Sequence, residues 1–300
     1  MITLAHVRQR KPFVWDYSAQ PKEAVKACNA CGGTYWVTLA DRDRYGFAVK
    51  THCCYACGLV FLSPRMTAEA YAEFYANTYR DLIAWYSDRP HDIVKGQERY
   101  AEKLMPILEA FVPEGAKTLL DIGGEPGICS ERICEEWKLK GILIDPACGG
   151  NLLNRGLVGC KPWGQGIGLE AFETDKRFDL ILMCQTVDHL LDLKGGLEKV
   201  RALLTDDGIF WVDIVDWCYR LRQTGSVEGA VKIDHPYNLT EASFERLLWG
   251  VGLRKVRKVY QGPHIGYVLK KGDVGKVEPD SPATLSLLQD VRKVQASQKR

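Results

Sequence analysis

The chain has 300 residues, and its hydrophobic fraction of 46% and charged fraction of 26% exclude disorder over most of its length. Forty Lys and Arg against 38 Asp and Glu leave a formal charge of +2, which lacks the basic excess of a protein held mainly by nucleic-acid phosphates. No apolar run approaches the roughly 18 residues that cross a bilayer, so we expect a soluble, cytoplasmic protein without a membrane span.

Residues 1–65 are rich in cysteine and turn residues and show little helical periodicity. This pattern predicts a small module that needs an external cross-link to be stable. A CxxC turn brings two thiolates to one side of a tight knuckle, and two such knuckles complete a tetrahedral shell for zinc. Two CxxC pairs occur here, 22 residues apart and each followed by glycine: Cys28, Cys31, Cys54 and Cys57. The alternative, cysteines that merely pack, would have to explain two matched units in a polar segment.

We expect this zinc ion to be structural, because a closed shell of four cysteines leaves no open coordination position. His52 and Cys53 lie beside the second pair and are interpreted as bystanders. The total of eleven cysteines is odd, and the others are scattered singly, which argues against a disulfide framework. The chemistry is therefore expected elsewhere in the chain.

The rest of the chain divides into three parts. Residues 66–112 contain two segments with apolar residues three and four apart, which predict helices in a linker or lid. In residues 113–271, short apolar runs alternate with helical stretches, which predicts an α/β domain with a parallel-rich, doubly wound sheet. The runs begin at Thr118, Gly141, Phe178, Gly208, Leu253 and Gly266. Residues 272–300 predict a tail, either a short amphipathic helix or a solvated terminus.

The first apolar run ends in Asp121 and leads into a glycine-rich turn at residues 123–127. Such a turn lets a ligand approach the backbone, and an acid beside it suits an ammonium group better than a pyrophosphate. The second run ends in Asp145, where a carboxylate can accept both hydroxyls of a ribose. Either acid alone is more often a helix cap or a solvated loop residue. Together they favour a ligand with a ribose and a positively charged amino-acid portion.

The runs LLDIGGEPG, ILID, FDLILMCQTVDHLLDL and LTDDGIFWVDI resemble class I S-adenosylmethionine-dependent methyltransferases over residues 113–271. The resemblance implies a Rossmann-like, seven-stranded sheet with an antiparallel last strand, and a cofactor across the carboxyl ends of the first strands. It implies cofactor contacts from Asp121, Gly123, Gly124, Gly127, Asp145, Pro146, Gln185 and Thr186. Glu125 departs from the pattern, because the family usually has its middle glycine there.

The cysteine pairs, the run CGLVFLSPR and the Tyr-rich segment after it resemble the zinc-knuckle extension of many bacterial methyltransferases of sugar, polysaccharide and natural-product pathways. The resemblance implies an O-methyltransferase for a hydroxyl of a sugar, a glycan or a related metabolite. Such a reaction needs alignment and a proton acceptor. His189 is our preferred base, with His235 and Tyr237 orienting the acceptor, and the alternative assignment is nearly as good.

Two further segments are candidates for ligand contact. Residues 163–167 follow the expected third strand and either contact the adenine or form a glycine-rich surface loop. The aromatic and basic residues 79–91 form either a lid over both ligands or a packed linker.

Other functions stay open. An RNA methyltransferase that uses the zinc module for recognition, a sugar C-methyltransferase, and a binding module in which Glu125 has spoiled the cofactor loop all fit parts of the sequence. The small net charge disfavours nucleic acid as a partner and favours a small molecule or a glycan. No sequence pattern requires a catalytic metal, and the oligomeric state is left open.

Overall fold

A computed structural model describes residues 13–87, 92–149, 164–276 and 281–298. Three parts of the sequence predictions fall outside these ranges: Cys160, Trp163 and the last part of the expected lid, residues 88–91.

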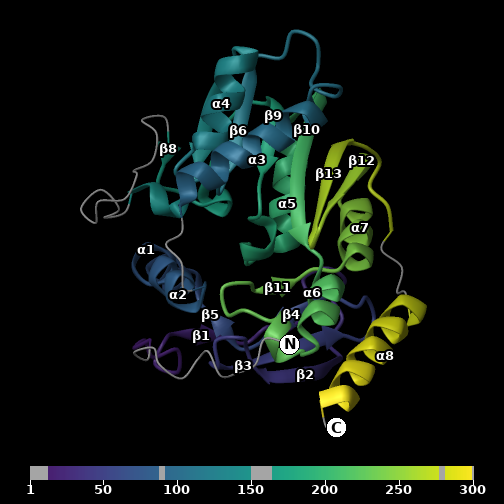
Figure 1. Cartoon of the computed structure of the whole chain (residues 1–300). Coiled ribbons are helices and arrows are strands. Elements are labelled where there is room, and N and C mark those ends of the chain that lie inside the picture. Colours follow the sequence, from purple (N-terminus) through teal and green to yellow (C-terminus); the bar gives the residue numbers. More distant parts are fainter. Residues whose placement is uncertain (1–12, 88–91, 150–163, 277–280, 299–300) are drawn as a thin grey trace.

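A seven-stranded sheet forms the centre of the molecule, in the order β12-β13-β10-β9-β6-β7-β8 (Figure 1). Its strands are β6 (Thr118–Ile122), β7 (Lys140–Ile144), β8 (Gly164–Gln165), β9 (Phe178–Met183), β10 (Leu204–Val215), β12 (Leu253–Gln261) and β13 (His264–Lys271). The strands from β8 to β10 pair in parallel, whereas β13 runs antiparallel to β10 and to β12. The predicted Rossmann-like α/β fold with an antiparallel last strand is confirmed.

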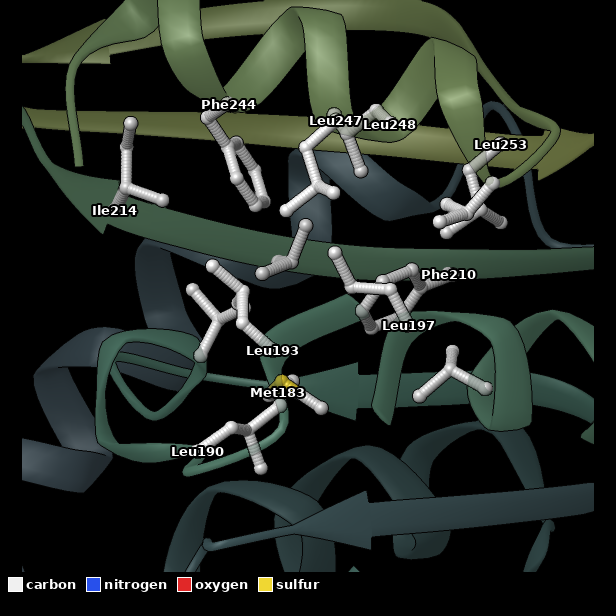
Figure 2. Close-up of a cluster of buried hydrophobic side chains, with 14 of the residues drawn as sticks. Met183, Leu190, Leu193, Leu197, Phe210, Ile214, Phe244, Leu247, Leu248 and Leu253 are labelled. Carbon is white, nitrogen blue, oxygen red and sulfur yellow. The ribbon is translucent and has the colours of Figure 1, made fainter. Parts of the chain in front are cut away.

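Helices cover both faces of this sheet because successive strand residues point to opposite sides. Leu119 and Leu180 face the helices α3 (Ile93–Leu108) and α4 (Ile128–Trp137). The next residues along the same strands, Leu120 and Ile181, face α5 (Leu193–Leu203) and α7 (Glu241–Gly250). Figure 2 shows this second core, in which leucines of α5 and α7 meet Met183, Phe210 and Ile214 of the sheet.

The N-terminal residues form a second sheet beneath the first (Figure 1), in the order β11-β4-β3-β2. Its strands β2 (Trp36–Arg42), β3 (Ala48–Cys54) and β4 (Val60–Leu62) come from the cysteine-rich segment. The outer strand β11 (Tyr237–Asn238) comes from the connection between α6 (Trp217–Thr224) and α7 and pairs antiparallel with β4. A short ribbon of β1 (Lys22–Glu23) and β5 (Arg65–Met66) completes this part. The cysteine-rich segment is thus joined to the larger domain by main-chain pairing.

Four helices surround the smaller sheet: α1 (Ala68–Asn77), α2 (Tyr79–Ser87), α6 (Trp217–Thr224) and α8 (Ser281–Gln298). Leu287, Leu288 and Val291 of α8 pack with Trp217 of α6 and Val60 of β4, so the tail contains a docked helix. Short 3-10 turns lie at Pro146–Gly149, Leu169–Ala171, Val187–His189 and Glu228–Ala230. Within the described ranges, none of the helices combines the length and the apolar character needed to cross a membrane.

Candidate active site

The cysteine pairs meet in a compact group. The Sγ atoms of Cys28, Cys31, Cys54 and Cys57 lie within 4.8 Å of one another. The separations of 3.5 Å between Cys28 and Cys57 and 3.6 Å between Cys31 and Cys54 are close to the roughly 3.8 Å between sulfurs that a tetrahedral shell with Zn–S bonds of about 2.3 Å requires. Four thiolate donors in this arrangement fit a structural zinc ion. His52 and Cys53 are directed elsewhere, His52 toward the Ser63 carbonyl and Cys53 into the core against α8.

The glycine-rich turn lies between two side chains that leave room for glycine only. Gly123 has a φ of +73°, and a Cβ there would come 2.2 Å from the Thr186 side chain. A Cβ on Gly124 would come 2.0 Å from the Asp121 carboxylate. Asp121 is 2% exposed and accepts a hydrogen bond from Ser130, so it supports the turn from beneath. Burial raises the pKa of Asp121 to about 7.

One glutamine of α3 holds the backbone of this turn. Gln97 Nε2 donates to the carbonyls of Gly124 and Glu125, at 3.1 and 2.8 Å. Its Oε1 accepts from the amides of Ile128 and Cys129 at the start of α4, at 2.8 and 3.3 Å. These four bonds fix the turn and use two of the amides that a helix N-terminus leaves without intrahelical partners.

Two carboxylates lie at the ligand side of the turn. Asp145 follows β7 and accepts from the amides of Glu125 and Ala147, at 3.2 and 2.8 Å, and burial raises its pKa. Glu125 contacts Arg80 of α2 through Oε2, while its Oε1 is buried and has no hydrogen-bond partner among the described residues. The open backbone of the turn, the ribose-type acid Asp145 and this unpartnered acceptor fit a ligand with hydroxyl and ammonium donors.

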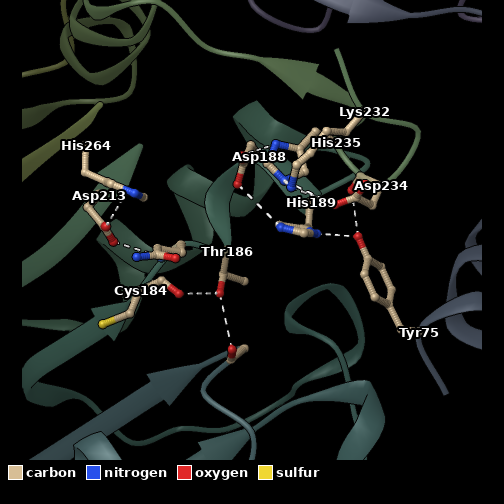
Figure 3. A network of polar contacts seen from close by, with 12 residues as sticks. Tyr75, Cys184, Thr186, Asp188, His189, Asp213, Lys232, Asp234, His235 and His264 are labelled. Atoms are coloured by element: carbon tan, nitrogen blue, oxygen red, sulfur yellow. Dashed lines mark hydrogen bonds and ion pairs between the residues drawn. The ribbon is translucent and has the colours of Figure 1, made fainter. Parts of the chain in front are cut away.

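A second polar cluster lies at the carboxyl end of β9, around Asp188 and two histidines (Figure 3). His189 Nδ1 contacts the hydroxyl of Tyr75, which comes from α1. The Tyr75 hydroxyl also donates to the Asp234 carbonyl at 2.6 Å. His235 Nδ1 lies 2.7 Å from Asp188, and the two imidazole rings are 4.7 Å apart.

These contacts assign the proton on His189. The Tyr75 hydroxyl has one hydrogen and donates it in a hydrogen bond to the Asp234 carbonyl. Its oxygen must therefore accept a hydrogen bond from His189 Nδ1–H. The Nε2 atom therefore carries the lone pair, 3.7 Å from Asp188. Burial lowers the pKa of His189 to about 4, so its imidazole is neutral at pH 7. His189 can accept a proton at Nε2.

His235 differs because both of its nitrogens are engaged. Nδ1 donates to the Asp188 carboxylate, whose pKa His235 and His189 lower although burial opposes the shift. Nε2 lies 2.8 Å from the Lys232 ammonium, which can only donate. Lys232 also binds Asp234 at 3.1 Å. The geometry therefore favours His189 as the proton acceptor and gives His235 a positioning role.

The same cluster contains three groups of the kind that bind metal ions. The ligand atoms of Asp188, His189 and His235 lie within 4.8 Å of one another. However, the Asp188 to His235 contact is a direct hydrogen bond, and the Lys232 ammonium beside His235 repels a second cation. These contacts favour proton transfer over metal binding.

A pocket of about 200 Å³ opens beside the cluster. Gln185 and His189 line it from the segment that follows β9, Tyr79 from α2, and Trp217 from α6. The smaller sheet helps to shape it, since Arg44 of the β2–β3 hairpin and Asn238 of β11 also line it. The pocket is therefore built by both parts of the chain.

Most of the predicted site residues lie at the carboxyl ends of β6, β7 and β9 in the central sheet. Gly127 begins α4 with a φ of +92°, and Thr186 donates to the Gly123 carbonyl at 3.2 Å. Pro146 is exposed just after β7, and residues 164–167 contain β8 and an exposed turn. Tyr237 differs from the prediction. It is 1% exposed, its hydroxyl donates to the Leu191 carbonyl and accepts from Arg65, and it does not line the pocket.

Sequence reasoning missed several contributors. Tyr75 is 114 residues from His189 and carries no local signal, although Tyr71, Tyr75 and Tyr79 have the spacing of one helix face. Gln97 and Arg80 also lie far along the chain from the turn that they support, 28 and 45 residues before Glu125. Lys232 stands only three residues before His235, so its contact with that histidine could have been expected from the sequence.

Comparison with known proteins bears on this geometry. Residues 95–258 match the family model of a methyltransferase domain. That match spans more than half of the chain. The chain belongs to this methyltransferase family. The predicted enzyme class is therefore confirmed. A comparison with the sequences of curated proteins gives no match.

Solved structures agree in fold. The plantazolicin methyltransferase BpumL in complex with SAH is 15% identical, with 67% of this chain and 94% of that chain covered and a TM-score of 0.51. An S-adenosylmethionine-dependent methyltransferase from Clostridium acetobutylicum is 18% identical, with 66% and 98% covered and a TM-score of 0.49. At 15% identity, the likeness to the plantazolicin methyltransferase shows the fold alone.

Proposed function

We propose that this methyltransferase uses S-adenosylmethionine to methylate a hydroxyl of a sugar, a glycan or a related metabolite, with His189 as general base. The observation that carries the proposal is the place of His189 in the pocket wall with its Nδ1 engaged by Tyr75. This contact leaves the lone pair on Nε2, and the lowered pKa keeps the imidazole neutral. A neutral imidazole is the form that takes a proton from a hydroxyl. S-adenosylmethionine, when bound, would supply the electrophilic methyl group.

The cofactor residues follow from the two carboxylates and the turn. Asp145 suits the ribose hydroxyls, the backbone of residues 123–127 suits the methionine portion, and Glu125 Oε1 offers an unpartnered acceptor for the ammonium group. Gln185 and Thr186 complete this side of the crevice. Asp121 acts through the turn, because its carboxylate is buried beneath Gly124.

The size and lining of the pocket support a small polar acceptor. Its volume of about 200 Å³ is below the roughly 300–1,000 Å³ of pockets that enclose drug-sized ligands, so it suits one ring or one terminal unit. The small net charge of +2 argues against RNA as the acceptor.

We divide the chain into a zinc module at 1–65, a helical linker at 66–112, a catalytic domain at 113–271 and a tail at 272–300.

The test is methyl transfer from labelled S-adenosylmethionine to a panel of sugars, sugar acids, sugar phosphates and oligosaccharides. We expect an O-methyl ether as product, and His189→Gln should lower kcat by about a hundredfold or more while calorimetry gives unchanged cofactor affinity. Tyr75→Phe should lower kcat less, because it removes the partner of Nδ1 and the bond to the Asp234 carbonyl but leaves the His189 imidazole in place. Tyr260→Phe, on the exposed edge strand β12, is the matched control and should be neutral.

Two results would contradict this assignment. Wild-type turnover of His189→Gln would remove the base, and a carbon-bound methyl group in the product would favour the C-methyltransferase alternative.

A further inference from the structure

Two guanidinium groups line the acceptor pocket without a carboxylate partner in the part of the chain that the structure describes. Arg44 lies on the β2–β3 hairpin and Arg220 on α6, so they come from opposite parts of the chain. Within the described ranges, the guanidinium of Arg44 makes two contacts: a 3.0 Å hydrogen bond from Nη2 to the Gly229 carbonyl, and stacking over the Tyr86 ring. Arg220 bonds to the Gln223 side chain at 2.6 Å. None of these partners carries a negative charge.

Part of this donor capacity is unused and shielded from water. Arg44 Nε is buried and has no hydrogen-bond partner among the described residues. A buried donor without a partner costs free energy, and a guanidinium donor costs more than a neutral one. A bound acceptor oxygen would remove that cost.

The two arginines also repel each other. Burial and the charge of Arg44 lower the pKa of Arg220, as expected for neighbouring cations without a counter-ion between them. Lys232, the other cation of the pocket lining, is paired with Asp234 at 3.1 Å. The Asp188 carboxylate accepts from His235 at 2.7 Å and is used within the histidine cluster. Arg44 and Arg220 are therefore the two cations of the lining that have no acidic partner among the described residues.

We infer that the acceptor carries an anionic group, a carboxylate or a phosphoryl group, which Arg44 and Arg220 bind while its hydroxyl faces His189. This inference rests on the proposed function, since it takes the pocket as the acceptor site. Planar guanidinium groups match both oxyanions, and a pair of them makes charge-assisted bonds that a neutral sugar cannot make. The substrate class is thereby narrowed to acidic or phosphorylated sugars and related hydroxy acids.

The test uses the zinc-loaded full chain saturated with S-adenosylhomocysteine, with inorganic phosphate and malonate as probes at constant ionic strength. Binding is followed by NMR through the arginine Nε–H signals, with Arg44→Gln to assign the Arg44 signal. We expect at least one probe to shift this signal with a millimolar dissociation constant. Arg44→Gln and Arg220→Gln should each weaken binding about tenfold or more. The control Arg257→Gln, exposed on β12, should leave binding unchanged.

The outcomes separate the alternatives. Binding of phosphate alone assigns a phosphoryl group, and binding of malonate alone assigns a carboxylate. The inference is overturned if neither probe binds below about 10 mM, or if the arginine variants bind as the wild type does. Cofactor affinity is measured on the same samples, so a failure of the proposed function would appear separately as a lack of S-adenosylhomocysteine binding.

Discussion

Two neighbouring histidines acquire different proton chemistry because their second nitrogens meet different partners. The Tyr75 oxygen accepts a hydrogen bond from Nδ1–H of His189, so Nε2 keeps the lone pair, whereas the Lys232 ammonium donates to Nε2 of His235. The sequence indicated both histidines, because each stands where this fold has the mouth of its cleft. It could not rank them, since Tyr75 reaches the site only through the packing of α1.

The first prediction concerns the pKa of His189. Burial lowers it to about 4, so the folded protein resists protonation that an unfolded chain accepts near pH 6.5. The native state then binds fewer protons between pH 4 and 6.5, and the free energy of unfolding should fall as the pH drops through this window.

NMR of histidine-labelled protein measures this pKa directly, with His189→Gln to assign the signal. We expect no titration of His189 between pH 8 and 5. A midpoint near 6.5 would show that the imidazole is exposed and would remove the argument for its protonation state.

Arg80 and Glu125 join α2 to the cofactor turn, and their pair offers a second prediction. Glu125 is 8% exposed, and breaking a buried pair leaves one charge without compensation. Arg80→Gln should lower the free energy of unfolding by about 2 kcal/mol, because Arg80 itself is partly exposed, and adding Glu125→Gln should restore most of the loss. Urea unfolding measures both effects.

The exposed pair of Arg254 and Asp273 is the matched control, with side chains 51% and 93% exposed. Arg254→Gln should change the free energy of unfolding by less than about 1 kcal/mol. An equal loss from Arg80→Gln and Arg254→Gln would contradict the role given to Arg80.

The elements of the larger domain were largely predictable. The runs TLLDI and FDLILMC lie on β6 and β9, because buried strands of a parallel sheet consist of short apolar runs between turns. The run LRKVRKVY lies on the exposed edge strand β12. β11 was not predictable, since Tyr237–Asn238 is too short for a periodic signal and pairs with β4 far away in sequence. The same limit explains Tyr237, whose hydroxyl serves Leu191 and Arg65.

The two sheets build the site together, because the smaller sheet is hydrogen-bonded to the loop that contains His235. Asp43 Oδ2 accepts from the Ile233 amide at 3.0 Å, and the Arg44 amide donates to the Val231 carbonyl at 3.0 Å. Leu62 donates to the Pro236 carbonyl at 2.9 Å. The cysteine group thus stabilises the wall of the acceptor pocket, whereas the cofactor turn belongs to the larger sheet.

This division predicts the effect of removing zinc. Cys54→Ser, or treatment with a strong chelator, should abolish methyl transfer, while S-adenosylhomocysteine affinity changes by less than about threefold. Proteolysis should cut the N-terminal segment before the larger domain. Simultaneous loss of cofactor binding and activity would show that the two parts do not separate in this way.

The most direct test of the whole account is calorimetric titration of S-adenosylhomocysteine into the zinc-loaded protein. We predict one site per chain with a micromolar dissociation constant, and Asp145→Asn should weaken it about tenfold or more because the ribose loses a charged acceptor. If the wild-type protein releases no binding heat and protects no cofactor crevice from hydrogen exchange, this methyltransferase does not use S-adenosylmethionine.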